Sequence, residues 1–430
     1  MNTVLYYKIK YWFIGCVFAA CNFILYDDYL GPRPEFKSFP VRRDKTNNTS
    51  LYSYYWVYSK HRYPTPNMTQ VSIDWEHQRR TIEKVCSTIQ DSNTNHSARG
   101  ILAWQIMYCP VGGAASTFLK KMMYQIKKTD PFRSPFEIPS KFIRECPKCF
   151  NYVDLYNNTQ FATPGEKIKN LMFVRDPWSR LFSAYVDKLY SPNPRYWTKW
   201  GVPAVKKFRQ NPSELSLRCG HDVTFSEFLL HHLSPGQGQM DADLLPAVDL
   251  CRPCTVPYDY IGHTTVFERD LSYVFTNWLD GKTSQTGLHT LAEDFVINEI
   301  EDSVLSPFQE WSEAITQCMS KLSAARRIWR RLQFRGIIST NLSFPSNITQ
   351  QVIQDMNAYD FIDILTSAAQ KSRAYQNLRQ QKRKVYTKAY MSISSSLMNR
   401  INQVYDLDFK MFNFRRWPRE RLAKQNIFEV

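Results

Sequence analysis

The chain has 430 residues, of which 43% are hydrophobic and 22% charged, a composition that excludes a disordered or fibrous protein and indicates a globular one. Its 55 basic and 39 acidic residues give a formal net charge of +16, which predicts an anionic partner: nucleic acid, an acidic membrane surface, an acidic polysaccharide or a phosphorylated cofactor. Charge alone is equally compatible with Lys and Arg that only keep the surface soluble.

An uncharged apolar segment, residues 11–26, follows two lysines and is closed by two aspartates. A membrane-spanning helix needs about 20 apolar residues, and flanking lysines favour the cytoplasmic side. The pattern therefore predicts a cytoplasmic tail over residues 1–10 and a single transmembrane signal-anchor over residues 11–28, in type II orientation. A cleaved signal peptide is the alternative, but small residues suited to cleavage do not follow the run.

Residues 29–80 are rich in Pro, Ser, Asn and Tyr, and we interpret them as a luminal stem that leads into a luminal domain over residues 81–430. Order is expected to begin with a helix over residues 75–90. Asn-x-Ser/Thr triplets favour a secretory route, because they are surface glycosylation acceptors in a lumen. These triplets begin at Asn47, Asn48, Asn67, Asn95, Asn157, Asn341 and Asn347.

Eight cysteines lie beyond the apolar segment, at positions 86, 109, 146, 149, 219, 251, 254 and 318. In an oxidising lumen an even number of cysteines predicts disulfide bonds, whose connectivity the sequence leaves open. The two CxxC pairs, Cys146/Cys149 and Cys251/Cys254, are also compatible with a four-thiolate zinc site. Their separation of about 100 residues is far wider than zinc-ribbon spacing, so we predict disulfides and no metal.

Apolar runs at residues 101–108 and 170–174 each predict one buried strand, and each is followed by a loop and a helical pattern. Strand, loop and helix repeated in this way predict an α/β domain with a central parallel sheet flanked by helices. Further on, residues 224–233 predict a helix with Thr224 and Glu227 as a capping box, and residues 258–263 a short strand.

A basic helix is predicted over residues 320–335. It holds four arginines around Trp329, and we interpret it as a solvated helix face.

The loop after the first apolar run reads CPVGGAAST, residues 109–117. Small side chains leave its backbone uncovered, so that several N–H groups and the positive end of the following helix can face an anion, and two hydroxyls can add donors. An ordinary tight turn is the alternative. The pattern GxxxxGK[ST] is not matched, which argues against a kinase or nucleotidase of the Walker type.

The second loop lies in FVRDPWSRLFSAY, residues 173–185. Arg175 ends a buried strand, and Arg180 and Ser183 lie on the first turns of the next helix, so the three side chains are expected near one edge of the sheet. Arginine offers a planar fork of donors suited to phosphate. An ion pair between Arg175 and Asp176 that caps the helix is the alternative.

These two loops together resemble the cofactor motifs of the membrane-bound Golgi carbohydrate sulfotransferases, specifically the chondroitin/dermatan 4-O-sulfotransferase-like family. Residues 250–275, with C-x-P-C, and residues 401–414, with Y-x-x-D-F-x-x-F-x-F, are also similar to blocks of that family and stand in the same order. The resemblance implies a P-loop-like sulfotransferase fold and transfer of a sulfuryl group from 3′-phosphoadenylyl sulfate to a hydroxyl of a glycosaminoglycan or an N- or O-glycan hexosamine in the Golgi lumen.

The resemblance also implies where the nucleotide binds. The first loop would take the 5′-phosphosulfate and the second the 3′-phosphate, with no metal. The residues implied are Gly112, Gly113, Ala114, Ala115, Ser116, Thr117, Phe118, Arg175, Asp176, Pro177, Arg180 and Ser183.

The sequence departs from the family at the loop lysine, because Gly113 stands where the family has that residue. Extra backbone donors could compensate, or Lys120 or Lys121 could reach back. The third interpretation is a catalytically weak or inactive member that binds glycan or cofactor, or supports a partner enzyme. A nucleic-acid binder conflicts with the predicted anchor and the glycosylation triplets.

The sequence also leaves the identity of the general base undecided, because Asp243 stands where many relatives have the histidine of a His-Trp pair. A base must accept the proton of the acceptor hydroxyl, a task for His, Glu or Asp. The other candidates are His221, His231, His232 and His263. Glu268, Asp270 and the intervening Arg269 are interpreted as mainly structural.

Overall fold

The computed structural model describes residues 67–89, 98–127, 135–155, 167–234, 240–278, 291–375 and 377–416. They lie within one compact unit of the chain, Tyr63–Val430. The predicted tail, the predicted anchor, most of the predicted stem and the triplets at Asn47, Asn48, Asn95 and Asn157 lie outside the described residues. Within the described ranges, no helix is both long enough and apolar enough to cross a membrane.

In the described part of the chain a mixed sheet of five strands has the order β3-β1-β2-β4-β5. The strands are β1 (Arg99–Ala103), β2 (Ile106–Cys109), β3 (Asn151–Asp154), β4 (Lys169–Val174) and β5 (Tyr260–His263). Strands β2, β4 and β5 run parallel, as predicted, whereas β1 pairs antiparallel with both β2 and β3. The prediction of a parallel sheet is thus correct for the β2–β4 and β4–β5 pairings and wrong for the two pairings of β1, the one strand of the five that runs in the opposite direction.

The error arises at residues 101–108, which form a hairpin and not one strand. Ala103 pairs with Ile106, so Trp104 and Gln105 alone make the turn, and Trp104 takes the left-handed φ of 52°. A continuous apolar run carries no sign of such a turn, because neither Gly nor Asn marks the left-handed position. The hairpin brings the end of β2, and the loop behind it, to the middle of the sheet.

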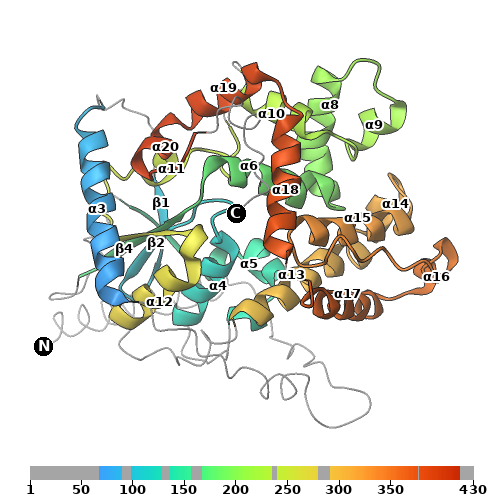
Figure 1. The fold of residues 1–430 in the computed structure, drawn as a ribbon, viewed down its shortest axis with the longest axis horizontal. Coiled ribbons are helices and arrows are strands. Elements are labelled where there is room, and N and C mark those ends of the chain that lie inside the picture. The colour runs from blue at the N-terminus through green and yellow to red at the C-terminus, as the bar shows by residue number, and fades with distance from the viewer. Residues whose placement is uncertain are drawn as a thin grey trace, which may run out of the picture. The chain divides into compact units, whose positions relative to one another are not determined.

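The helices on and around the sheet are α3 (Met68–Cys86), α4 (Ser116–Lys127), α5 (Ser140–Glu145), α11 (Ala247–Cys251), α12 (Phe267–Trp278) and α20 (Asp406–Met411). One face of the sheet packs against the apolar sides of α4 and α12, through residues such as Leu119 and Leu271. The other face packs against α11 and α20, through Val248 and Met411. Figure 1 shows the strands between these helices, with α3 beside them.

Helix α3 begins at Met68 and is capped by the side chain of Asn67, so it starts earlier than the helix expected over residues 75–90. It lies against the sheet, with the ring of Trp75 5.6 Å from that of Tyr260 in β5. Asp74 and Arg269 of α12 form an ion pair at 2.6 Å. The boundary predicted near residue 80 therefore falls inside a helix that packs on the domain.

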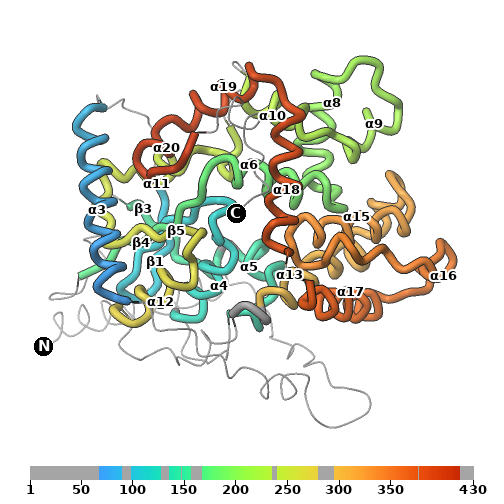
Figure 2. Tube along the Cα trace, in the orientation of Figure 1, coloured from blue at the N-terminus to red at the C-terminus, as the bar shows by residue number. Residues whose placement is uncertain are grey.

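The remaining helices form a second, helical part of the same unit: α6 (Pro177–Tyr185), α7 (Pro194–Tyr196), α8 (Val202–Phe208), α9 (Glu214–Cys219), α10 (Phe225–Leu233), α13 (Leu291–Phe308), α14 (Ser312–Thr316), α15 (Lys321–Phe334), α16 (Gln350–Asp355), α17 (Ala358–Ser372), α18 (Leu378–Met391) and α19 (Ser395–Val404). Two π-helical turns, η4 (Val186–Tyr190) and η5 (Trp197–Gly201), interrupt this part. Helices α18, α19 and α20 lead back from it toward α11 (Figure 2).

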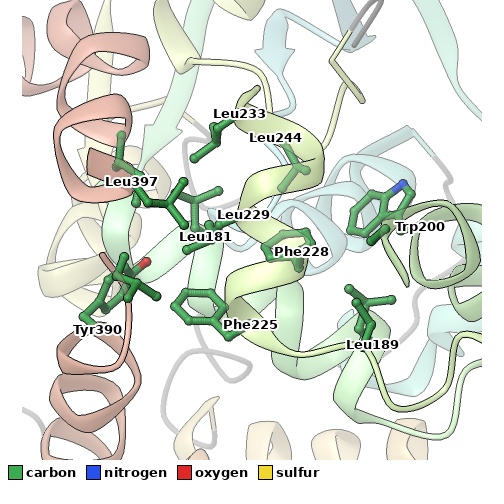
Figure 3. Packing of buried hydrophobic residues seen from close by; sticks show 14 of the residues in the cluster. Leu181, Leu189, Trp200, Phe225, Phe228, Leu229, Leu233, Leu244, Tyr390 and Leu397 are labelled. Carbon is green, nitrogen blue, oxygen red and sulfur yellow. The ribbon is translucent and has the colours of Figure 1, made fainter. Parts of the chain in front are cut away.

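Helix α10 is the centre of the largest apolar cluster in this part, and its predicted capping box of Thr224 and Glu227 is confirmed. Phe225 packs edge-on against Tyr390 of α18, and Phe228 stacks on Trp200 of η5 at 5.8 Å between ring centroids (Figure 3). Helices far apart in the sequence are thereby held in one core.

All eight cysteines beyond the apolar segment form disulfides, as predicted: Cys86–Cys254, Cys109–Cys251, Cys146–Cys149 and Cys219–Cys318. The C-x-P-C pair does not bond to itself. Its two cysteines reach to α3 and to the end of β2.

Candidate functional site

The anion loop, residues 110–115, leaves β2 and enters α4 at the carboxyl edge of the sheet. Leu119 makes the first helical hydrogen bond, to the Ala115 carbonyl at 3.0 Å, so the N–H groups of Ser116, Thr117 and Phe118 have no acceptor within the helix. These groups and the helix dipole can receive an anion. The side chain of Phe118 instead packs on Phe136 and Phe267, so only its backbone is available for binding.

Two residues of the anion loop have left-handed backbones, Gly113 with φ of 75° and Ala115 with φ of 58°. An alanine in this conformation is strained, and such strain is concentrated at functional sites. Gly112 is needed for another reason. A Cβ there would lie 2.8 Å from the Cα of Asp243, so only glycine allows this close approach.

The second loop follows β4, the parallel neighbour of β2, and touches the anion loop directly. The guanidinium of Arg175 donates to the Gly113 carbonyl at 3.1 Å. Asp176 caps α6 through its side chain, which accepts from the Ser179 N–H at 3.1 Å, and Pro177 begins the helix. Asp176 and Pro177 thus position the loop. The two loops meet as ligand-binding loops do at the carboxyl ends of adjacent parallel strands.

Arg180 is buried beneath the anion loop, with 3% of its surface exposed. Its guanidinium donates to the carbonyls of Gly112 at 3.0 Å and Leu245 at 2.9 Å, and lies 3.6 Å from the carboxylate of Asp408. The sequence suggested Arg180 as a direct anion ligand. These contacts hold the loop in place, and direct anion binding by Arg180 stays a prediction, since its buried Nη1 has no hydrogen-bond partner among the described residues.

Asp408, in the C-terminal block, receives the N–H groups of Ala247 and Val248 at 2.9 and 3.0 Å and so caps α11 from a distance. Tyr405 of the same block donates to the Leu244 carbonyl at 2.5 Å. The disulfide Cys109–Cys251 joins α11 to the end of β2. All four sequence blocks therefore meet at one place, around the anion loop.

A cation cluster lies on the α6 side of this place and consists of Arg175, Arg331, Arg335 and Lys382. Arg335 and Arg331 bind the carboxylate of Asp187 at 2.8 and 3.1 Å. Both also lie within 3.4 Å of Glu299. With Asp176 acting on Arg175 as well, four cations face three carboxylates, which leaves an excess of one positive charge.

Ser183 borders the same cluster, and its hydroxyl donates to Asp187 at 3.2 Å. The Nε of Arg335 is buried and has no hydrogen-bond partner among the described residues. A buried donor without an acceptor is costly, so both the excess charge and this group fit an anion at the cluster.

The pKa values of Asp187 and Lys382 also indicate that the cluster favours an additional negative charge. Burial alone would raise the pKa of Asp187, but Arg335, Arg331 and Arg175 hold it below the ordinary value. Loss of hydration, together with the charges of Arg175 and Arg335, lowers the pKa of Lys382 to about 8. The cations repel one another, and a bound anion would relieve that repulsion.

The basic helix α15 is only partly the solvated face that the sequence suggested, because Arg326 and Arg330 are exposed whereas the other two arginines are not. Arg331 is buried and forms ion pairs, and Arg327 donates to the His221 carbonyl at 2.7 Å. The pattern of arginines was visible in the sequence, but their acidic partners are Asp187 and Glu299, which lie far away along the chain.

On the other side of the anion loop, Asp243 forms an ion pair with Lys188 of η4, and the Tyr196 hydroxyl lies 3.4 Å from the same carboxylate. Asp243 is 43% exposed and Lys188 18%. Sequence reasoning considered Asp243 as a base but did not single out Lys188, Asp187, Arg335 or Lys382. The available signal was the charged pair of residues 187 and 188 inside an apolar helical pattern.

Lys121 does not reach back to the loop, because its side chain is buried and its ammonium donates to Asn298 of α13 at 3.0 Å. Lys120 is half-buried on α4.

His263 ends β5, where its backbone N–H donates to the buried Asp270 at 2.7 Å, and burial lowers the pKa of the His263 side chain. Arg269 binds Asp270 as well as Asp74, which agrees with the structural role expected for Arg269 and Asp270.

The other histidine candidates lie in the helical part. His221 packs near Trp197, and His232 packs on Trp200 and Phe228. Burial lowers the pKa of His221 and of His231, and lowers that of His232 to about 3. These environments are those of packing residues.

Three glycosylation triplets can be placed, and each asparagine is exposed: Asn67, Asn341 and Asn347. Asn67 caps α3 through its side-chain oxygen, which accepts from the Gln70 N–H at 3.2 Å. Its amide nitrogen, the atom that carries a glycan, takes no part in that hydrogen bond.

Two loops at the carboxyl ends of adjacent parallel strands, beside an excess of cations, define an α/β protein with a candidate site for an anionic ligand. The chain belongs to the sulfotransferase family, whose sequence pattern matches residues 103–361. No solved structure matches the chain.

Carbohydrate sulfotransferase 11 of Rattus norvegicus is 28% identical over 179 residues, which are 40% of this chain and 49% of that protein. Carbohydrate sulfotransferase 14 of Danio rerio is 35% identical over 118 residues, 26% of this chain and 32% of that protein. Carbohydrate sulfotransferase 9 of Homo sapiens is 38% identical over 171 residues, 39% of this chain and 38% of that protein. The matches thus span about half or less of these relatives' length.

Proposed function

We propose that the chain transfers a sulfuryl group from 3′-phosphoadenylyl sulfate to a carbohydrate hydroxyl. The observation that carries the proposal is the contact between the two loops, where Arg175 binds the Gly113 carbonyl beside a cation cluster with excess charge. The anion loop would hold the 5′-phosphosulfate through backbone N–H groups. Arg175 and Ser183 would hold the 3′-phosphate. For this the Ser183 hydroxyl would exchange its hydrogen bond to Asp187 for one to the phosphate.

The acceptor we propose is an anionic glycan of the glycosaminoglycan type, with an N- or O-glycan hexosamine as the other possibility. Three relatives are named carbohydrate sulfotransferases, and the net charge of +16 favours an acidic polymer. We place the protein in the Golgi membrane as a single-pass type II protein with the domain in the lumen. Four disulfides and the exposed asparagines of the triplets support a secretory route.

The test is label transfer by the full-length chain from ³⁵S-labelled 3′-phosphoadenylyl sulfate to a panel of desulfated glycosaminoglycans and N- and O-glycans. We expect label on at least one acceptor. Binding of adenosine 3′,5′-bisphosphate without transfer to any acceptor would contradict enzyme activity and leave a nucleotide-binding member of the family.

The assignment of the 3′-phosphate to the cluster is tested by Arg175→Ala and Ser183→Ala. Each removes a donor to a charged group, so each should weaken adenosine 3′,5′-bisphosphate binding by about tenfold or more in calorimetry. Arg79→Ala is the matched control, because Arg79 makes only exposed ion pairs on α3. Unchanged affinity in both site variants would refute the assignment.

A further inference from the structure

The ammonium of Lys188 is held by a set of side chains beside the anion loop, next to Gly112. It forms an ion pair with Asp243 and donates to the Tyr196 hydroxyl at 3.1 Å. It also lies over the rings of Tyr196 and Trp200, 4.4 and 4.8 Å from their centroids. The π-helical turn η4 carries both Lys188 and its neighbour Asp187. The two side chains have different partners, because Asp187 binds the cation cluster whereas Lys188 binds Asp243. Such turns are frequent at functional sites.

Asp243 connects this ammonium to the anion loop. A Cβ on Gly112 would lie 2.9 Å from the Oδ1 of Asp243 and 2.8 Å from the Cα of Asp243, so the carboxylate lies against the loop backbone. Its other oxygen, Oδ2, binds Lys188. The ammonium is therefore separated from Gly112 by the width of one carboxylate.

Lys188 also has binding capacity left. A lysine ammonium has three N–H donors. Among the described residues one is directed to Asp243 and one to Tyr196, so the third has no oxygen or nitrogen acceptor and meets only the rings of Tyr196 and Trp200. Because Asp243 is 43% exposed, this place is open to a ligand in the loop.

Other cations near the loop are less suited to this position. Lys121 points to α13, and Arg180 is buried among carbonyls and Asp408. A lysine at position 113 itself would be strained, because that backbone has a φ of 75°.

We propose that Lys188 is a catalytic residue that binds the 5′-phosphosulfate end of the donor, and that Asp243 holds it there and accepts the acceptor's proton. This inference rests on the proposed function. The acceptor oxygen forms a new bond to sulfur while the sulfur–oxygen bond to the 5′-phosphate breaks, and the electron pair of that bond stays on the phosphate oxygen.

The hydroxyl proton passes to the Asp243 carboxylate in the same step. Neutral Asp243 no longer balances Lys188, whose charge then faces the phosphate that has gained a negative charge. Positive charge thus becomes available where negative charge develops, the arrangement that stabilises a transition state.

The test uses full-length Lys188→Met and Lys188→Arg. Loss of the ammonium should lower kcat by about 10² to 10³, with a smaller change in the acceptor KM, and arginine should restore much of the rate. Lys199→Met is the matched control, because this neighbouring lysine pairs with Asp241 at 2.5 Å and is 54% exposed. Asp243→Asn should also lower kcat, with Lys188 still charged. A kcat for Lys188→Met within threefold of the unchanged chain, or a loss in Lys120→Met instead, would overturn the inference.

A binding measurement separates this inference from the proposed function. Lys188→Met should weaken adenosine 3′,5′-bisphosphate about tenfold and leave adenosine 3′-monophosphate unchanged, because only the first has a 5′-phosphate. That split would support the position of Lys188 even in a chain that transfers no label. Equal loss for both nucleotides, or no loss for either, would refute it.

Discussion

At the scale of single residues, the anion loop depends on two glycines for different reasons. A Cβ at Gly112 meets the backbone of Asp243 at 2.8 Å, whereas at Gly113 the nearest atom is 3.7 Å away and only the positive φ resists substitution. We predict that Gly112→Ala lowers the affinity for adenosine 3′,5′-bisphosphate more than Gly113→Ala does, because it displaces the loop. Calorimetry on both variants checks the order, and a larger loss in Gly113→Ala would contradict it.

Asp408 gives a prediction about pH. Burial raises its pKa to about 6, although Arg180 and two N–H groups oppose the rise. Because its pKa in the unfolded chain is about 3.9, the folded state binds more protons between pH 4 and 6, and the contribution of this carboxyl to stability falls as pH rises through that window.

The expected fall is about 2 to 3 kcal/mol, and it ends above pH 6. Urea unfolding of the unchanged chain and of Asp408→Asn at several pH values measures it, since the difference between the two curves isolates this group. A difference that does not vary from pH 4 to 6 would show that the carboxyl keeps its ordinary pKa.

At the scale of elements, the Cys109–Cys251 disulfide fixes the end of β2 against α11, directly before the anion loop. Replacing both cysteines by serine should cost about 3 to 5 kcal/mol, since the bond spans a sequence separation of 142. It should also weaken nucleotide binding. The double variant of Cys146 and Cys149, with a separation of 3, is the control and should lose less stability and keep its affinity. Equal effects on affinity would contradict the role of the first bond.

Helix α3 provides a second prediction at this scale. A chain that begins at Tyr63 retains the whole helix, whereas one that begins at residue 81 loses Val71, Trp75 and the ion pair of Asp74 with Arg269. The longer chain should unfold cooperatively and the shorter one should expose apolar surface and aggregate. Equal melting temperatures would show that residues 67–80 belong to the stem, as the sequence suggested.

Local patterns predicted much of the fold. The strand at residues 170–174, the capping box of α10 and the presence of disulfides each depend on neighbouring residues, and each is confirmed. The hairpin at Trp104 was missed because its turn lacks Gly or Asn. The partners of Arg180, Arg331 and Lys188 were also missed, because they come from segments that only the tertiary fold brings together.

At the scale of the whole molecule, the site combines the part that matches the family with segments beyond it. The pattern match ends at residue 361, yet Lys382, Tyr405 and Asp408 all contribute to the site or its support. Helices α18 to α20 return from the helical part to the sheet (Figure 2). The fold thus places charges from the middle and the C-terminal end of the described chain around one anion loop.

The central claim is that this site binds a nucleotide with both a 5′- and a 3′-phosphate. Calorimetry of the full-length chain with adenosine 3′,5′-bisphosphate and with adenosine 5′-monophosphate tests it most directly. Since charge-assisted hydrogen bonds contribute about 1.5 to 3 kcal/mol each, the bisphosphate should bind about a hundredfold more tightly, and Arg175→Ala should remove most of the difference. Equal affinities for the two nucleotides would contradict the claim.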